Sequence, residues 1–269
     1  MNKIIIQYDK INKLYTQFSP DEKGIVRLWD VCTKLLLYIS PLEVIIASYK
    51  RLINYKKEDY SKILEKIKNN CTLSHEEELL HSKIEKLYSF IEVWVAFHTY
   101  LAILLSLLIF YTLSYNEKVI IYLITYYGVW RVFEIIIKQI RVIMFDTIGK
   151  KAISIKSARR SIIMLIHNIA EMIFWFACSF MSVCVLEPSF AAKGYVHLSD
   201  LYRWSDFIRC STLQFTTFGD SYTVIGLMMQ GNTILINITF WEIMIGFIII
   251  VISIGRFFSM LPSKGDQVS

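Results

Sequence analysis

Residues 211–223 read STLQFTTFGDSYT and lie between two long apolar segments near the C-terminus. Residues 206–215, which lead into this stretch and include its first five residues, have the composition of a short helix, for which Ser205 or Asp206 is the expected side-chain cap. Glycine reaches backbone dihedrals that other residues avoid, so Gly219 suits a chain that leaves a helix and turns sharply. The pattern predicts a short helix and a tight loop set between two longer helices.

The composition on either side of this stretch is that of a membrane protein. The chain has 269 residues, of which 55% are hydrophobic, with a mean hydropathy of +0.45 and only 4 prolines. We therefore expect the lipid bilayer to be its main partner. Lys+Arg 29 against Asp+Glu 23 gives a net charge of +6, but basic residues interleaved with aromatics are confined to segments that flank apolar runs. This distribution argues against binding to nucleic acid.

Apolar runs predict four transmembrane helices, because a helix needs roughly 20 apolar residues to cross the hydrocarbon core. The expected spans are 93–116, 119–137, 161–186 and 233–261. A tight turn at 114–118 should send the second span straight back. The second span contains Arg131 and Glu134, three residues apart on one helix face and able to pair.

The distribution of basic residues predicts the orientation. Residues 138–160 hold seven lysines and arginines against one acid, Asp146, so this linker should be cytoplasmic, as should the lysine-rich N-terminal region. Four spans then place both termini in the cytoplasm and residues 211–223 on the outer side. We expect a multi-pass protein of the cell membrane, whether a bacterial inner membrane or a plasma membrane.

Residues 1–87 are mostly charged and amphipathic and predict a cytoplasmic helical region. Capping boxes at Ser19 and Ser74, each with a glutamate three residues on, predict two helix starts. The segment 25–49 is apolar but interrupted by charges, and it is interpreted either as packing on or under the membrane bundle or as a further span. The first residues, MNKIIIQYDKINKLY, are broken by polar residues, so we expect no cleavable signal peptide.

The string Thr216-Thr217-Phe218-Gly219-Asp220 resembles the pore loop of the tetrameric potassium-channel superfamily. The resemblance implies an all-α membrane protein with a re-entrant pore helix and filter loop between the last two of four transmembrane helices. It implies Thr216 and Thr217 as inner filter ligands, Phe218 and Gly219 as carbonyl donors, and Asp220 as a carboxylate at the outer mouth or an anchor to the pore helix. Permeant potassium or sodium would occupy the filter, with no bound cofactor.

The string departs from the potassium-selective pattern T-V-G-Y-G-D, because Thr217-Phe218-Gly219-Asp220 is two residues shorter than that pattern. It is similar to the T-I-G-E filter of cyclic-nucleotide-gated channels, which pass several monovalent cations. Fewer carbonyl rings leave fewer places to distinguish potassium from sodium, which favours weak selectivity. Alternatively, Phe218-Gly219-Asp220 matches the family's Y-G-D, and both registers remain open.

The last apolar segment resembles the inner helix of bacterial two-span pore domains, in which a glutamate often precedes a glycine by four residues. Glu242 and Gly246 have this spacing. Gly246 is a candidate hinge or a packing contact. Glu242 should turn toward the pore helix of its own or the next subunit. A ring of Ile250 or Ile254 would close the pore by dewetting.

One copy of such a loop cannot bury its own backbone within hydrocarbon, so we expect a homotetramer. The expected parts are the N-terminal region 1–87, an accessory helix pair and linker 88–160, a pore domain 161–262 and a tail 263–269. Because that tail is short, an unidentified regulator would act through the N-terminal region.

Other charged and polar residues predict no sensor, metal or catalytic site. Arg131, Lys138 and Arg141 do not keep the every-third-residue spacing of a voltage sensor. His167 and Glu171, four apart in the third span, should bond to each other or to a neighbouring helix. No C-x-x-C pair links the five cysteines, Cys32, Cys71, Cys178, Cys184 and Cys210.

The sequence therefore predicts a cation channel and not an enzyme. A non-conducting membrane scaffold or signalling protein with the same fold is the alternative. A membrane enzyme or transporter is disfavoured, because neither a nucleophile–base pair nor an inverted repeat is visible.

Overall fold

The computed structural model describes residues 40–53, 57–69, 71–144, 155–188, 196–216, 218 and 231–260, and every regular element within these ranges is helical. Four helices are long and apolar enough to cross a membrane, which confirms the predicted number of spans. These are α5 (His75–Tyr111), α6 (Lys118–Met144), α7 (Ile155–Leu186) and α11 (Thr233–Met260). The shorter helices are α3 (Pro41–Leu52), α4 (Lys57–Lys68) and α9 (Trp204–Phe215), with 3-10 turns η1 (Tyr115–Glu117) and η2 (Leu198–Asp200).

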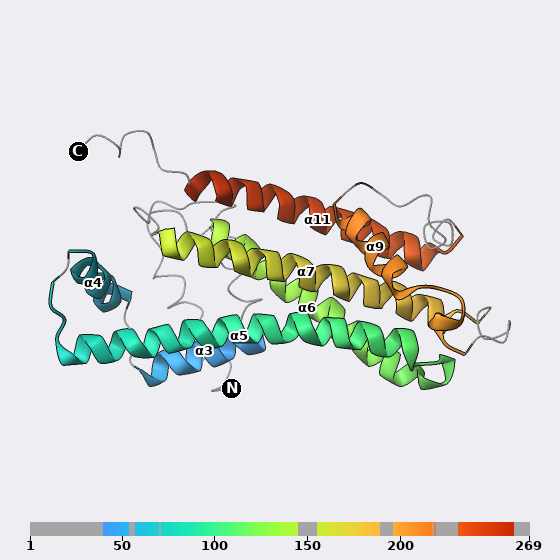
Figure 1. Cartoon of the computed structure of the whole chain (residues 1–269), viewed down its shortest axis with the longest axis horizontal. Coiled ribbons are helices and arrows are strands. Elements are labelled where there is room, and N and C mark those ends of the chain that lie inside the picture. The colour runs from blue at the N-terminus through green and yellow to red at the C-terminus, as the bar shows by residue number, and fades with distance from the viewer. Residues whose placement is uncertain are drawn as a thin grey trace, which may run out of the picture.

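The four long helices alternate in direction along one axis (Figure 1). We call one end of the bundle the hairpin end, where α5 turns into α6, α7 finishes and α11 begins. The opposite end, beside α4, is the α4 end. The expected orientation would place the hairpin end on the outer side of the membrane.

Helix α5 begins at the capping box predicted at Ser74. The Ser74 hydroxyl accepts a hydrogen bond from the Glu77 amide at 3.3 Å, and the Glu77 carboxylate accepts one from the Ser74 amide at 2.9 Å. The helix then continues without interruption through the expected boundary between residues 87 and 88. It ends at Tyr111, so the last residues of the expected span 93–116 belong to the following turn.

That turn reverses the chain as predicted. The amide of Ser114 donates to the Glu117 carboxylate at 2.8 Å, and the Ser114 hydroxyl bonds to the same carboxylate. The ammonium of Lys118 lies 3.7 Å from the centre of the Tyr115 ring. These contacts close η1 and make α5 and α6 antiparallel neighbours.

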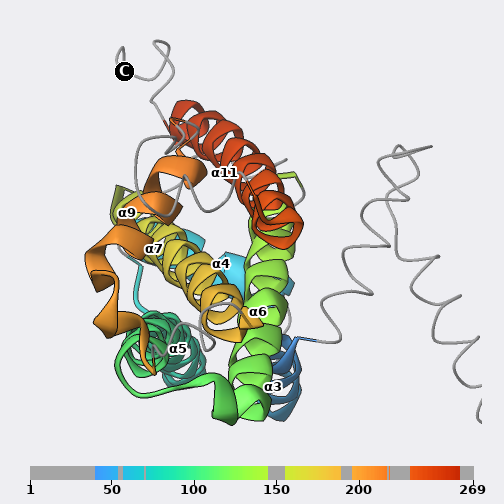
Figure 2. The same cartoon turned by 90° about the vertical axis from the view of Figure 1, so that its right-hand side faces the viewer.

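Helix α7 forms the centre of the bundle, with α5, α6, α9 and α11 arranged around it (Figure 2). Within its most apolar stretch 67% of residues are buried, against 22% for α11. Trp175 is 1% exposed and faces Gly128 of α6, where an added Cβ would lie 2.7 Å from the Trp175 ring. Small residues such as Gly128 allow helix backbones to approach closely, which favours association within lipid.

The N-terminal helices pack on α5 in two small clusters. Leu42 and Ile46 of α3 contact Leu87 of α5, while Tyr60 and Ile63 of α4 pack on another part of α5. Residues 41–49 therefore pack against α5, and the two interpretations of segment 25–49 both remain open. The Ser19 capping box and the rest of that segment lie outside the described residues.

Candidate functional site

Helix α9 crosses α7 from the α5 side of the bundle toward α11 (Figure 2). At its start, the indole nitrogen of Trp204 donates to the Ser106 hydroxyl of α5 at 3.1 Å. The Trp204 ring also stacks on Phe174 of α7, with centroids 6.0 Å apart. These contacts fix the first residue of α9 against both neighbouring helices.

The predicted cap of α9 is wrong. The helix begins at Trp204, two residues earlier than expected, and the capping position is Arg203 instead of Ser205 or Asp206. Arg203 makes no side-chain cap hydrogen bond. The physical reason is the anchoring of Trp204 by Ser106 and Phe174, which holds the helix start in place without a capping side chain.

The second half of α9 packs on α11 through two contacts with matched spacing. The Ser211 hydroxyl is hydrogen-bonded to the Glu242 carboxyl, and Phe215 lies against Gly246. Each pair of partners is four residues apart on its own helix, so α9 and α11 run in the same direction where they meet. A Cβ on Gly246 would overlap the Phe215 carbonyl oxygen and lie 2.9 Å from its carbon. Gly246 is therefore a packing contact of the kind predicted as the alternative to a hinge.

These contacts define the depth at which α9 ends. At the rise of an α-helix, Gly246 lies about 20 Å along α11 from Thr233, and the hydrocarbon core of a bilayer is about 30 Å thick. Phe215 is thus well inside the apolar length of the bundle. A twelve-residue helix that begins nearer the hairpin end stops at this depth.

The residues that follow α9 are described only in part. The Thr216 hydroxyl donates back to the Thr212 carbonyl at 2.8 Å, and the Phe218 amide donates to the Leu213 carbonyl at 2.9 Å. The Phe218 side chain is 83% exposed in the single chain. The other predicted filter residues, Thr217, Gly219 and Asp220, lie outside the described residues.

The predicted inner-helix residues have different environments. Glu242 is 0% exposed and contacts α9 of its own chain, which is the first of the two partners predicted for it. Ile250 is partly buried, and Ile254 is 51% exposed. The structure thus brings Glu242, Gly246 and the end of α9 together, and leaves Ile254 uncovered.

A second buried polar cluster joins α6 to α7. The Arg131 guanidinium pairs with Glu134 on its own helix, as predicted, and its Nε lies 2.6 Å from Oε1 of Glu171 on α7. Glu171 therefore bonds to a neighbouring helix, the second of its two predicted partners, and not to His167. Lys138 also pairs with Glu134 at 2.9 Å. Because two acids balance two bases, the cluster adds no net charge to the bundle.

The sequence did not reveal that α3 reaches this cluster. Ser40 caps α3 by accepting from the Glu43 amide at 3.3 Å, and its hydroxyl donates to the Glu134 carboxylate. No local pattern connects residues so far apart in sequence. The contact anchors the start of α3 to the charged centre of the bundle.

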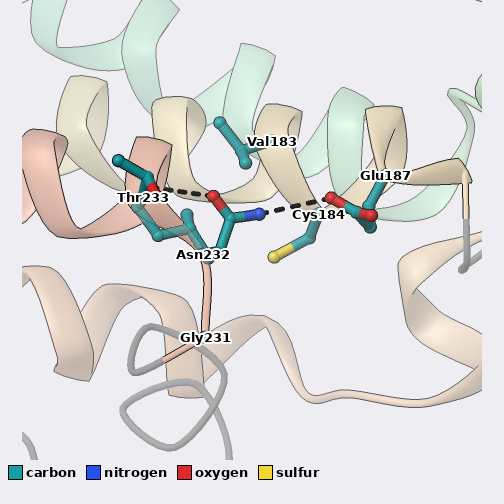
Figure 3. A pocket seen from close by; sticks show the side chains of 7 residues that line it. Val183, Cys184, Glu187, Gly231, Asn232 and Thr233 are labelled. Atoms are coloured by element: carbon teal, nitrogen blue, oxygen red, sulfur yellow. Dashed lines mark hydrogen bonds between the residues drawn. The ribbon is translucent and has the colours of Figure 1, made fainter.

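A pocket of about 360 Å³ lies at the hairpin end between α7 and α11 (Figure 3). Asn232 points into it and donates to the Glu187 carboxylate at 3.2 Å, while its own oxygen accepts from the Ile234 amide at 2.9 Å. Asn232 thereby caps α11 and ties its start to the end of α7. Among the described residues, histidine, cysteine and acidic side chains form no group that could hold a metal ion.

No known protein family, no curated protein and no solved structure matches this chain. Its function is inferred from its own residues and from the geometry of α9 and α11.

Proposed function

We propose that this chain is one subunit of a homotetrameric cation channel in which residues 216–220 form the narrow part of the pore. The observation that carries the proposal is the depth of α9, whose last residue, Phe215, lies beside Gly246 in the middle of α11. A helix of about half the membrane length that stops at this depth supports a re-entrant arrangement. The next residue after Phe218 that the structure describes is Gly231, which lies at the hairpin end just before α11.

Irregular backbone at this depth is stable only if it is buried in protein or lines water. The end of α9 also suits a cation, because the aligned peptide dipoles place roughly half a negative charge at a helix C-terminus. The bases of the charged cluster, Arg131 and Lys138, are already paired with Glu134 and Glu171. We therefore expect backbone carbonyls of the loop to serve as oxygen ligands, and the paired bases of α6 do not oppose a cation.

The need for further copies comes from surfaces that one chain leaves uncovered. Helix α11 is the least buried of the four spans. Its outward residues include Asn237 and Trp241 on one face, and an amide within an apolar stripe favours hydrogen bonding across helices over contact with lipid. The side chain of Phe218, which follows α9, is also exposed in the single chain. Four copies around one axis would cover both.

The conducted ion is potassium or a mixture of monovalent cations. The stretch TFGD, residues 217–220, is two residues shorter than T-V-G-Y-G-D and would supply fewer carbonyl rings. We therefore expect weak discrimination between potassium and sodium.

The test is reconstitution of the full chain in planar bilayers, with sodium and potassium reversal potentials as the readout. Gly219→Ala and Asp220→Ala should abolish or strongly reduce the current. Gly255→Ala is a matched control, because an added Cβ there meets nothing within 4 Å. Mass measurement in lipid discs should give four chains per particle.

A non-conducting scaffold or signalling protein is the second candidate, favoured by the Thr216 hydroxyl, which is turned back onto α9 instead of being free. Tetramers that conduct no monovalent cation would support this candidate and contradict the channel. Monomers in lipid would contradict the pore arrangement altogether.

A further inference from the structure

Glu242 occupies the junction of three helices. Its carboxyl group on α11 bonds to the Ser211 hydroxyl of α9, and the same hydroxyl lies 2.8 Å from the carbonyl oxygen of Ile173 on α7. Glu242 and Ser211 are both 0% exposed. Three oxygen atoms from three helices therefore form one row, closed to water in the single chain.

The number of hydrogen atoms available to these three oxygens indicates whether Glu242 is an ionised carboxylate or a neutral acid. A serine hydroxyl has one hydrogen, a backbone carbonyl only accepts, and an ionised carboxylate only accepts. With Glu242 ionised, Ser211 could donate to only one of its two neighbours, and the other oxygen–oxygen contact would have no hydrogen. With Glu242 as a neutral acid, the acid donates to Ser211 and Ser211 donates to Ile173, so both contacts are hydrogen bonds.

The charges on the surrounding helices do not alter this conclusion. The ionisable groups with described side chains on the three elements that pack against α11 are Asp206, Arg209 and Cys210 of α9, Arg160, His167, Glu171, Cys178 and Cys184 of α7, and Lys118, Tyr122, Tyr126, Tyr127, Arg131, Glu134 and Lys138 of α6. The lysines and arginines among them have other partners: Arg131 and Lys138 pair with Glu134 and Glu171, Arg209 with Asp206 at 3.9 Å, and Arg160 with Glu92, while Lys118 lies over the Tyr115 ring.

Among the described residues, none forms an ion pair with Glu242, and its Oε2 atom has no hydrogen-bond partner there. A buried carboxylate without a cation is far more costly than a buried neutral acid, and such groups neutralise instead. An acid carbonyl oxygen without a donor costs much less than a carboxylate oxygen in the same place.

We infer that Glu242 is a buried proton-binding site, and that its proton links α11 through Ser211 to α7 and holds α9 between them. Loss of the proton would place a negative charge in this junction and release α9 from α11. The inference concerns the bundle and holds whether or not the chain conducts ions. If it conducts as proposed, release of α9 would displace the loop that begins at Thr216.

Infrared spectroscopy of the full chain in lipid discs tests this inference directly. The wild type should show the carbonyl stretch of a protonated carboxylic acid at neutral pH, and Glu242→Gln should lose it. Glu187→Gln is the control, because Glu187 lies at the hairpin end, partly exposed and bonded to Asn232. A band that persists in Glu242→Gln, or that is missing from the wild type, would overturn the inference.

Amide hydrogen exchange supplies the second measurement. At alkaline pH, α9 of the wild type should lose protection relative to α5, beyond the intrinsic effect of pH. Glu242→Gln carries an amide in place of the acid and should keep its protection. Equal pH dependence of α9 in the two proteins would contradict release by deprotonation, and neither measurement requires ion conduction.

Discussion

Glu171 and Glu242 are both 0% exposed and both lie on membrane-length helices, yet the bundle accommodates them in opposite ways. Glu171 faces Arg131 at 2.6 Å and accepts from the Trp175 indole at 3.3 Å. Glu242 has a serine hydroxyl as its partner. Burial alone therefore does not determine whether a glutamate is ionised in this protein.

The two arrangements differ in what they allow the helices to do. An ion-paired cluster holds α6 and α7 together only while every charge is present, because one missing member leaves a bare charge in a low dielectric. A neutral acid holds α9 on α11 by ordinary hydrogen bonds, whose net worth is about 1 kcal/mol each. We therefore infer a fixed half of the bundle, around Arg131, and an adjustable half, around Glu242.

The largest expected effect is the difference in the free energy of unfolding between Glu171→Gln and Glu242→Gln. Glu171→Gln should lower the free energy of unfolding by about 3–5 kcal/mol, because it leaves Arg131 under-paired in the buried cluster. Glu242→Gln should change it by no more than about 1 kcal/mol, since an amide replaces a neutral acid. Unfolding in mixed detergent micelles measures both. Equal losses at the two sites would remove the distinction between them.

A smaller effect is expected where α9 and α11 touch. Gly246→Ala should cost about 1–3 kcal/mol, because the new Cβ overlaps the Phe215 carbonyl and one helix must move. Gly255→Ala on the same helix has open space and should leave stability unchanged or higher. If Gly246→Ala were as well tolerated as Gly255→Ala, the close approach of the two helices would be in doubt.

The edge of the charged cluster should be less sensitive than its centre. Ser40→Ala removes a hydrogen bond to Glu134 and the cap of α3, but Glu134 keeps Arg131 and Lys138. A cost of about 1 kcal/mol is expected, with faster amide exchange confined to α3. Ser48→Ala, at an exposed position of α3, is the control and should have no effect. Exchange that also accelerates in α6 would show that Ser40 belongs to the centre of the cluster.

The smallest effect concerns a third carboxylate, Asp200, which is exposed in the connection before α9. The His197 and Val196 amides donate to it at 2.9 and 3.1 Å, and these bonds hold the pKa of Asp200 below its ordinary value. Since the folded pKa is the lower one, the stabilisation is present above about pH 4 and is lost as the pH falls through the lowered pKa.

Exchange of the His197 and Val196 amides across this acid range measures the effect. The amides should become less protected on acidification in the wild type, and Asp200→Asn should abolish that pH dependence. Protection that stays constant in the wild type would argue against the lowered pKa.

Much of the fold was predictable because its signals are local. Four apolar runs predicted four long helices, the capping box predicted the start of α5 at His75, and the turn after Ser114 predicted the reversal into α6. The continuity of α5 across residue 87 was not predicted, because a change from charged to apolar composition does not by itself end a helix.

The site was predictable only in part, because its contacts join distant segments. Spacing within one helix was sufficient to predict the Arg131–Glu134 pair, and the cost of burying a charge was sufficient to predict that Glu242 faces a short helix such as α9. Arg131 with Glu171, Ser40 with Glu134, and Trp204 with Ser106 depend on how helices pack, and no local pattern encodes them. The capping error at α9 has the same origin.

Helix α5 is continuous over its whole length, so a movement of one end is coupled to a movement of the other. Its 37 residues extend about 55 Å, against a hydrocarbon layer of about 30 Å, so roughly 25 Å project toward α4. If the membrane-embedded part acts as a pivot, rocking α5 by about 5° moves that projecting tip by about 2 Å. On the opposite arm, Ser106 is bonded to Trp204, the first residue of α9. A displacement of α5 at the α4 end would therefore be transmitted along this one continuous helix to the start of α9.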